Sequence, residues 1–346
     1  MPTPLDIEQP GALAAYLHTA GRVSADEQVC VERLAGGVSN RTMLVRRTAG
    51  PDWVVKQALP QLRVAVEWFS DPRRIEREAA GMRWLAALAP PGAIAPLVFE
   101  DRPHHLLAME AVPQPHENWK TVLLSGRLDA GHVRSFAELL AAIHRRAFER
   151  QAEIAAEFDD RSFFESLRLE PYYAFAAEHV PSAAEFLHRL IHETRATRLT
   201  LVHGDYSPKN VLIYAGRLVL LDHEVIHFGD PAFDLGFSLA HLLSKAHHVA
   251  RLRGEFAAAA EDYWRQYRDA LGPLPWAAEL EPRAVRHTLG CLLARVAGRS
   301  PLEYLDAAAR ARQRDAVLAL LDCPPTTVAG LAAAFIERLP SHAEDR

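Results

Sequence analysis

The stretch LVHGDYSPKNVLI, residues 201–213, places a short polar loop between two apolar runs. The apolar runs favour strands, and Gly204 and Pro208 exclude a regular helix from the loop between them. Asp205 is a carboxylate in this loop, where it can accept the proton of a hydroxyl nucleophile. Asn210 follows five residues later and can offer a neutral oxygen to a metal ion. The segments around this loop must show which reaction it serves.

Length and composition limit the possible classes of protein. The 346 residues suffice for one large two-lobed domain or two ordinary ones, and 49% of them are hydrophobic, which allows a sizeable core. A formal net charge of −5 argues against a general nucleic-acid binder, which would present a basic face. The three cysteines lack CxxC spacing, so neither a disulfide framework nor a zinc site is expected. No signal peptide or membrane span is recognisable, and we expect a cytoplasmic protein without a membrane partner.

The N-terminal third is predicted to be a small sheet with one long helix. Apolar and polar residues alternate on both sides of a Gly-Gly turn, a pattern typical of strands. In the helical segment, Asp71 can cap the first turn and Pro72 suits its start. The predicted elements are a helix over 11–18, strands within 29–47 and over 52–59, a helix over 71–88 and a hairpin over 97–112.

The pattern changes near residue 113 and becomes mostly helical. The predicted elements there are amphipathic helices over 130–149 and 181–196, a tight hairpin over 210–224 with Gly216 in its turn, and Ala-rich helices from Asp234 onward. We therefore predict an α+β fold of two lobes. The division is an N-terminal lobe over 1–112, a hinge at about 109–113 and a helical lobe over 114–346.

The Gly-Gly turn can serve as an anion-binding loop. Gly36 and Gly37 lack side chains, so backbone N–H groups there can approach a phosphate closely. Ser39 and Asn40 add short polar groups beside them. Taken alone, the same pattern also suits an ordinary hairpin turn.

Lys56 lies in the apolar strand segment WVVKQAL, where a buried charged group needs a partner. The following helix offers Glu76 and Glu78, which lie on different faces. Glu78 shares its side with the apolar positions of the helix, so we favour Glu78 and keep Glu76 as the second candidate. A lysine that reaches solvent from a strand edge is the alternative.

A second acidic segment, LVLLDHEVIHFGDPAFDLGF, follows the hairpin. Asp222 ends an apolar strand, and Mg²⁺ prefers a small number of such hard oxygen ligands. Glu224 would lie on the same side if the strand continues. We expect Asp234 to be a helix N-cap that holds the catalytic loop, and His203 to orient this loop rather than take part in chemistry.

Together, the order of Gly loop, strand lysine, helix glutamate, hinge, H-G-D-x-x-x-x-N and strand aspartate is the arrangement for phosphoryl transfer from a Mg-nucleotide. In this order the sequence resembles the aminoglycoside phosphotransferase and choline kinase group of the protein-kinase-like fold. The resemblance covers roughly residues 34–305. A protein kinase is disfavoured because only eleven residues separate Asp222 from Asp234 and no A-P-E stretch occurs.

Within this group, the stretches VVKQALPQLRV, LDHEVIHFGDPAFDLGF and ARVAG are similar to the methylthioribose-kinase-like branch. The chain departs from that branch where D-P-E is replaced by Asp222-His223-Glu224. It also has Ala294 where the branch has the first of two paired arginines, so that only Arg295 remains. The resemblance therefore implies the fold and the reaction, but not methylthioribose as the substrate.

The resemblance implies a role for each matching residue. Asp205 would be the catalytic base, and Lys209 would neutralise the γ-phosphate. The implied magnesium ligands are Asn210, Asp222 and Glu224. The implied ATP-binding residues are Gly36, Gly37, Ser39, Asn40, Lys56, Glu78, Met109, Glu110 and Val112.

The acceptor is expected to be a small molecule with a hydroxyl group, held by the helical lobe. Arg295 is the leading candidate for contacting it, with the aromatic residues Trp119, Tyr263 and Trp264 as weaker ones. A neutral or weakly charged small metabolite is favoured over an aminoglycoside or another antibiotic, and a pseudokinase that binds nucleotide without turnover is the alternative of a different class. A homodimer and a monomer are both open.

Overall fold

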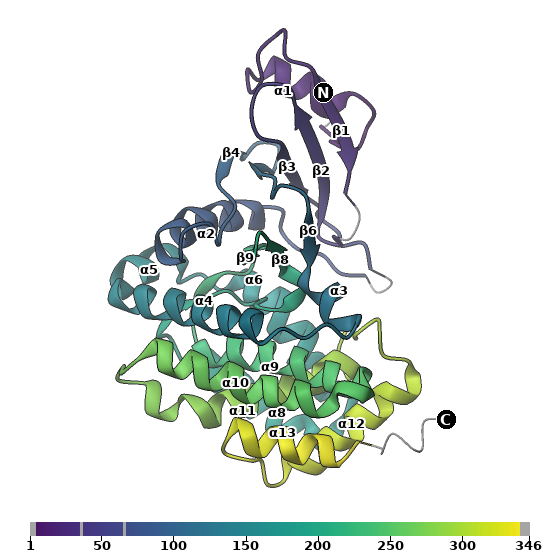
Figure 1. The fold of residues 1–346 in the computed structure, drawn as a ribbon, viewed down its shortest axis with the longest axis vertical. Helices are drawn as coiled ribbons and strands as arrows, with labels where there is room; N and C mark the ends of the chain where they lie inside the picture. The colour runs from purple at the N-terminus through teal and green to yellow at the C-terminus, as the bar shows by residue number, and fades with distance from the viewer. Residues whose placement is uncertain (1–4, 35–36, 65–66, 340–346) are drawn as a thin grey trace.

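The computed structural model describes residues 5–34, 37–64 and 67–339, which form a sheet lobe above a larger helical lobe (Figure 1). The sheet lobe has antiparallel strands in the order β1-β2-β3-β5-β4. Its strands are β1 (Val29–Arg33), β2 (Asn40–Arg47), β3 (Trp53–Ala58), β4 (Leu97–Asp101) and β5 (Leu106–Glu110). The strands and the hairpin predicted from the sequence are confirmed.

Successive side chains along β3 point to opposite faces of the sheet, and the two faces pack against different elements. Trp53 and Val55 pack with helix α1 (Ala12–Thr19) in a core on the outer side. Val54 packs on the other side, toward helix α2 (Arg74–Leu88). Because successive side chains of a strand point to opposite faces, Lys56 shares the face of Val54. Lys56 is thereby directed toward α2 and the second lobe.

The start of α2 differs from the prediction. The helix begins at Arg74 rather than near Asp71. The Asp71 carboxylate instead accepts the backbone N–H of Arg73 at 2.9 Å, which closes a turn ahead of the helix. An aspartate before a helix can cap the helix or close a turn ahead of it. In this chain Asp71 closes the turn.

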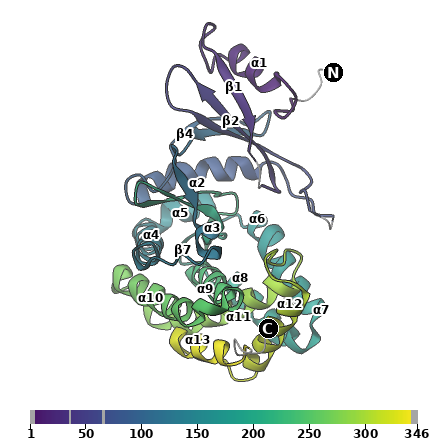
Figure 2. The same ribbon diagram turned by 45° about the vertical axis from the view of Figure 1, so that its right-hand side comes forward.

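The helical lobe contains the predicted helices over 130–149 and 181–196, the latter with a 3₁₀ turn as its first residues (Figure 2). A π-helix, η1, was not predicted. The helical elements are α3 (Trp119–Leu124), α4 (Ala130–Glu149), α5 (Gln151–Phe158), α6 (Ser162–Phe164), η1 (Glu165–Ala174), α7 (Phe175–His179), α8 (Ala184–Ala196), α9 (Pro231–His248), α10 (Arg253–Leu271), α11 (Leu280–Ala297), α12 (Ala307–Leu321) and α13 (Val328–Glu337), with 3₁₀ turns over Pro181–Ala183, Pro208–Asn210, Ala250–Leu252 and Ala277–Glu279.

Two small sheets lie between the lobes and carry the loops of interest. One pairs β6 (His116–Asn118), β8 (Val211–Tyr214) and β9 (Arg217–Leu220), and the other pairs β7 (Thr200–Val202) with β10 (His227–Gly229). The predicted hairpin of β8 and β9 is confirmed, but β9 ends at Leu220. The strand therefore does not continue through the acidic residues after it.

Helix α9 is the centre of the helical lobe, because its residues from Pro231 through His247 are all buried. At Gly236 the helix lies so close to α11 that a Cβ atom would be 2.6 Å from the backbone carbonyl carbon of His287. A distance of this size leaves no room for a side chain. Among the described residues, no helix is long and apolar enough to span a membrane.

We predict that Gly236→Ala destabilises the protein by about 1–3 kcal/mol, because the added methyl group forces α9 and α11 apart. The measurement is the free energy of unfolding in urea.

Gly254→Ala is the matched control, since a Cβ at Gly254, in the first turn of α10, meets nothing within 4 Å. This change is expected to leave stability unchanged or to raise it by up to about 1 kcal/mol. Equal losses in the two variants would contradict the close approach of α9 to α11.

Candidate functional site

The site is formed by two neighbouring loops, the β7–β8 loop and the β9–β10 loop. The backbone N–H of Leu221 donates to the carbonyl of Asn210 at 2.8 Å, which holds the loops together. Gly204 has φ 76°, and a Cβ there would lie 3.0 Å from both the carbonyl oxygen and a methyl group of Val225. A glycine is therefore needed where the first loop bends under the second.

Asp234 anchors the β7–β8 loop from inside the first turn of α9. Its two carboxylate oxygens accept the backbone N–H of His203 at 2.7 Å and of Gly204 at 2.8 Å. The expected contact with the loop is thus present, but the helix N-cap is Asp230, whose carboxylate accepts the N–H of Ala232 at 2.9 Å. The prediction that Asp234 is the cap was wrong because the helix begins one turn earlier.

The carboxylate of Asp205 is buried and surrounded by donors. Its Oδ2 lies 2.9 Å from Arg168, 3.0 Å from Lys209 Nζ and 2.8 Å from the amide nitrogen of Asn210. Burial would raise the pKa of Asp205, but the charges of Arg168 and Lys209 outweigh it and lower this pKa. Asp205 is therefore held as a carboxylate. Its other oxygen, Oδ1, is buried and has no hydrogen-bond partner among the described residues.

His203 lies in a chain of hydrogen bonds beneath the loop. Its Nδ1 accepts the backbone N–H of Asp205 at 3.2 Å, so its Nε2 carries the proton and donates to Nδ1 of His223 at 3.1 Å. Burial lowers the pKa of both imidazoles, which keeps them neutral. This geometry agrees with the orienting position that was expected for His203.

The predicted pair of Lys56 and Glu78 is present, with Nζ and Oε1 2.6 Å apart, and Nζ also lies 3.2 Å from Asp222 Oδ1. Burial would lower the pKa of Lys56, but these two carboxylates outweigh it and raise this pKa. Glu76 lies instead on the solvent side of α2, 3.7 Å from Arg102. The choice between the two glutamates is thereby settled for Glu78.

Arg74 connects the Gly loop to the acidic segment. Its fully buried guanidinium donates to the carbonyls of Ser39 and Leu59 and to Glu224 Oε2, the last at 3.1 Å. The amide of Asn40 also lies 3.5 Å from this Glu224 oxygen. Ser39, Asn40 and Glu224 therefore lie together, with Glu224 bound to an arginine.

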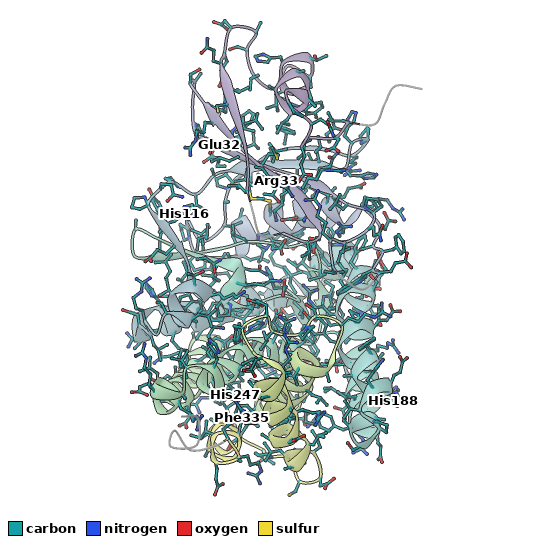
Figure 3. The ribbon with its side chains drawn as sticks, turned by 90° about the vertical axis from the view of Figure 1, so that its right-hand side faces the viewer. Glu32, Arg33, His116, His188, His247 and Phe335 are labelled. Atoms are coloured by element: carbon teal, nitrogen blue, oxygen red, sulfur yellow. The ribbon has the colours of Figure 1, made fainter. Side chains whose placement is uncertain are left out.

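A cavity of about 630 Å³ lies between the lobes, beside β3 and the segment that follows β5. In Figure 3 the labelled His116, one of its lining residues, lies at the level where the two lobes meet. Of the predicted ATP-binding residues, those that line it are Gly37, Lys56, Met109, Glu110 and Val112. Ser39 and Asn40 are not among its lining residues, and Gly36 is outside the described residues.

The oxygen atoms available to a metal ion fit magnesium. Asp222 has φ 68°, an uncommon left-handed conformation outside glycine, directly after β9. Burial would raise its pKa, but Lys56 and Lys209 lower it, so the carboxylate stays ionised. The Asn210 amide directs its nitrogen to Asp205, which leaves its oxygen on the opposite side. No group of three or more His, Cys, Asp or Glu in the described ranges is arranged to bind a metal ion.

Arg295 lies deeper in the helical lobe than the two loops. Its Nη1 donates to the hydroxyl of Tyr172 at 3.1 Å and to the Ser300 hydroxyl at 3.0 Å. Within the described residues, no hydrogen bond or ion pair joins Arg295 to the anionic partners considered for it, Asp234 and Glu303, although its charge acts on Glu303 at longer range. The side chains of the aromatic candidates pack in the core of the helical lobe, and their contact with an acceptor stays a prediction; these residues are Trp119, Tyr263 and Trp264.

Two arginines of the site were missed from the sequence. Arg168 lies in η1, and a π-helix segment is frequent at functional sites. Its apolar neighbours were a usable signal, since an arginine between Leu167 and Leu169 needs a polar partner. Arg74 offered no such signal, because it is one of several charged residues in a row.

Comparison with known proteins identifies a family that this chain matches. Residues 31–274 match the phosphotransferase enzyme family. Methylthioribose kinase of Yersinia pestis (strain Pestoides F) is 26% identical over 275 residues, covering 71% of this chain and 66% of that relative, slightly less than two thirds of its length.

Solved structures show the same fold. The macrolide 2′-phosphotransferase MphH from Brachybacterium faecium matches with a TM-score of 0.51 at 21% identity, over 90% of this chain and 98% of that one. Amicoumacin kinase hAmiN, in complex with AMP-PNP, Ca²⁺ and Ami, matches with a TM-score of 0.54 at 17% identity, over 86% and 89% of the two chains. The expected protein-kinase-like two-lobed fold is confirmed.

We predict that Glu78→Gln weakens the binding of Mg·ATP by about tenfold or more, equivalent to about 1.4 kcal/mol. The change removes the charge that holds Lys56 toward the cavity. Isothermal titration with Mg·AMP-PNP measures the affinity.

Glu76→Gln is the matched control, because this neighbour on α2 lies on the solvent side and contacts only the exposed Arg102. Its affinity should stay within about twofold of the unaltered chain. Equal effects of the two substitutions would show that the Lys56–Glu78 pair has no part in nucleotide binding.

Proposed function

The chain belongs to the phosphotransferase enzyme family, and we propose that it transfers the γ-phosphate of ATP to a hydroxyl group of a small molecule. The observation that carries this proposal is the Asp205 carboxylate, kept ionised by Arg168 and Lys209 beside the cavity-lining Lys56 and the acidic Asp222. A phosphoryl-transfer site needs this combination of an acceptor-orienting carboxylate and cations for phosphate.

Asp205 orients the acceptor hydroxyl and receives its proton. The acceptor oxygen then forms a bond to the γ-phosphorus while the bond from this phosphorus to the β–γ bridging oxygen breaks, and ADP leaves. The Nζ of Lys209 lies 3.0 Å from Asp205 Oδ2, and its side chain is 43% exposed. Lys209 can therefore reach the phosphate as it moves from the nucleotide to the acceptor. Positioning and charge stabilisation provide most of the rate enhancement.

ATP lies in the cavity between the lobes in this proposal. Lys56 contacts the α- and β-phosphates, and Gly36 and Gly37 lie in the loop that covers them. The backbone of Glu110 and Val112, after β5, binds the adenine, and the segment over 109–113 is the hinge between a lobe over 1–112 and a lobe over 114–346.

Asp222 and Asn210 would hold Mg²⁺, which neutralises phosphate charge when it is bound. Glu224 is the weaker candidate, since its Oε2 is already bound by Arg74. Ser39 and Asn40 act through the same arginine and glutamate, and they position the Gly loop rather than contact phosphate.

The acceptor class follows less directly. The relatives named above include a methylthioribose kinase, a macrolide phosphotransferase and an amicoumacin kinase, so both metabolites and antibiotics are represented. We propose a metabolite, with an antibiotic as the second candidate. A nucleotide-binding protein without turnover is disfavoured because Lys56, Asp205, Asn210 and Asp222 are all present, with Lys56 paired to Asp222 and Asn210 bonded to Asp205.

The main test is Asp205→Asn in an assay of ADP release over a panel of hydroxyl acceptors, including methylthioribose, choline, macrolides and aminoglycosides. We expect a loss of at least about a hundredfold in kcat, because the substituted amide cannot accept the proton. Binding of Mg·AMP-PNP should be retained. Undiminished phosphoryl transfer would refute the assignment of Asp205.

Arg168→Met tests how Asp205 is kept ionised. Arg168 lowers the pKa of Asp205, so its removal raises this pKa, and the acid limb of kcat/KM should move to higher pH. Arg145→Met, an exposed arginine paired with Glu149, is the control and should leave the profile unchanged. An acid limb that stays in place in Arg168→Met would show that the arginine only supports the fold.

A further inference from the structure

The chain has 39 lysines and arginines but only four lysines, and these are not spread over its surface. Lys56 contacts Asp222, and Lys209 contacts Asp205. The other two, Lys120 in α3 and Lys245 in α9, have no part in the transfer step proposed above. Their surroundings lie on the acceptor side of the site.

Lys245 is fully buried, and no carboxylate of the described residues lies within ion-pair distance of it. Its Nζ donates to the carbonyl of His241 at 3.1 Å and lies 5.6 Å from the ring centroid of Tyr304. Burial and the charge of Lys120 lower the pKa of Lys245 to about 7, against the opposing effect of the more distant Glu303. A buried ammonium with one backbone acceptor is an unfavourable arrangement unless something else completes it.

Other polar atoms near Lys245 are buried and lack hydrogen-bond partners within the described part of the chain. They are His241 Nε2, Arg295 Nε and Tyr304 Oη. His241 is 4% exposed and Arg295 is 8% exposed. Lysine and arginine offer only donors, so the group that would complete this cluster is rich in acceptor atoms.

The cluster is connected to the catalytic loop through Tyr172. The guanidinium carbons of Arg168 and Arg295 lie 5.7 and 5.6 Å from the centroid of the Tyr172 ring. Arg168 also contacts Asp205 at 2.9 Å. One aromatic side chain therefore separates the cationic cluster from the arginine that holds the catalytic carboxylate.

The loop between α11 and α12 rises beside α3 (Figure 1). Two of its residues bind the cations: Glu303 pairs with Lys120, and Ser300 accepts from Arg295. The Lys120–Glu303 contact lies near the surface, where the side chain of Glu303 is 61% exposed. An anion from outside can exchange with Glu303 at modest cost, because exposed ion pairs are weak.

We propose that the acceptor carries an anionic group, a carboxylate or a phosphate, that binds Lys245, Arg295 and Lys120 while its hydroxyl group lies at Asp205. This inference rests on the phosphoryl transfer proposed above and specifies its substrate class. It narrows the neutral or weakly charged metabolite that was favoured from the sequence to an anionic one. The anion supplies the counter-charge that the buried lysine lacks, and it takes over the contact that Glu303 makes with Lys120.

The first test compares related acceptors of which one is anionic and the other neutral: glycerate with glycerol, gluconate with glucose, and ribose 5-phosphate with ribose. ADP release should be at least about tenfold higher in kcat/KM for an anionic member than for its neutral partner. The pairs also show whether a carboxylate or a phosphate is preferred. Preference for a neutral member, or for choline or kanamycin, would overturn the proposal.

The variants Lys245→Met and Arg295→Met test whether the preference for anionic acceptors arises from this cluster. Each should raise KM for the preferred anion by about tenfold or more. Lys245→Arg keeps the charge and should retain part of the selectivity. All four lysines belong to the site, so the control is Arg189→Met, an exposed arginine on α8 paired with Glu185. Unaltered selectivity in Lys245→Met would refute the site.

If no acceptor is phosphorylated, binding measurements test the anion site. Malonate and inorganic phosphate are titrated calorimetrically into the protein, with and without saturating Mg·AMP-PNP. Saturable anion binding that is lost in Lys245→Met supports the cluster, and absence of such binding overturns it. Failure to bind AMP-PNP would instead refute the proposed function, while anion binding without nucleotide would still report on Lys245.

Discussion

The carboxylate of Asp234 is the contact on which the site depends. It is buried in the first turn of α9 and accepts the backbone N–H groups of His203 and Gly204. Those two groups follow the end of β7 at Val202 and have no strand partner there. The carboxylate needs donors and the loop needs an acceptor, so each satisfies the other in a region without water. The position of Asp205 is thereby tied to the most buried helix of the protein.

Charge pairing then sets the chemistry of the cleft. Lys56 lies between Glu78 and Asp222, and Asp205 lies between Arg168 and Lys209. In each case the opposite charge outweighs the effect of burial on pKa, so both aspartates remain ionised. Lys245 is the exception to this pairing within the described residues, since its Nζ donates to a backbone carbonyl and no carboxylate lies within ion-pair distance. An exception of this kind in an otherwise balanced site is what indicates a missing anionic partner.

Much of the fold was predictable because its signals are local. The helix over 130–149 has both an apolar stripe and an Asp129 cap, and the β8–β9 hairpin has Gly216 at its turn. Errors arose where one acidic residue had two local uses. Asp71 closes a turn instead of capping α2, and Asp234 binds a loop while Asp230 caps α9. Which of the two uses of the carboxylate has the lower free energy depends on neighbouring groups from other parts of the chain. A local sequence pattern does not contain those groups.

By itself the sequence determined the order of Lys56, Glu78, Asp205, Asn210 and Asp222, and the alternation that turns Lys56 toward the cleft. Only the tertiary structure decided which distant groups complete them. Arg74 meets Glu224 across 150 residues, and Arg168 meets Gly204 across 36. An arginine pairs with the acceptor that is buried beside it, and burial arises only when separate elements pack. For the same reason, Arg295 was recognisable as a residue in need of a partner, while Tyr172 and Ser300 were not recognisable as the partners it has.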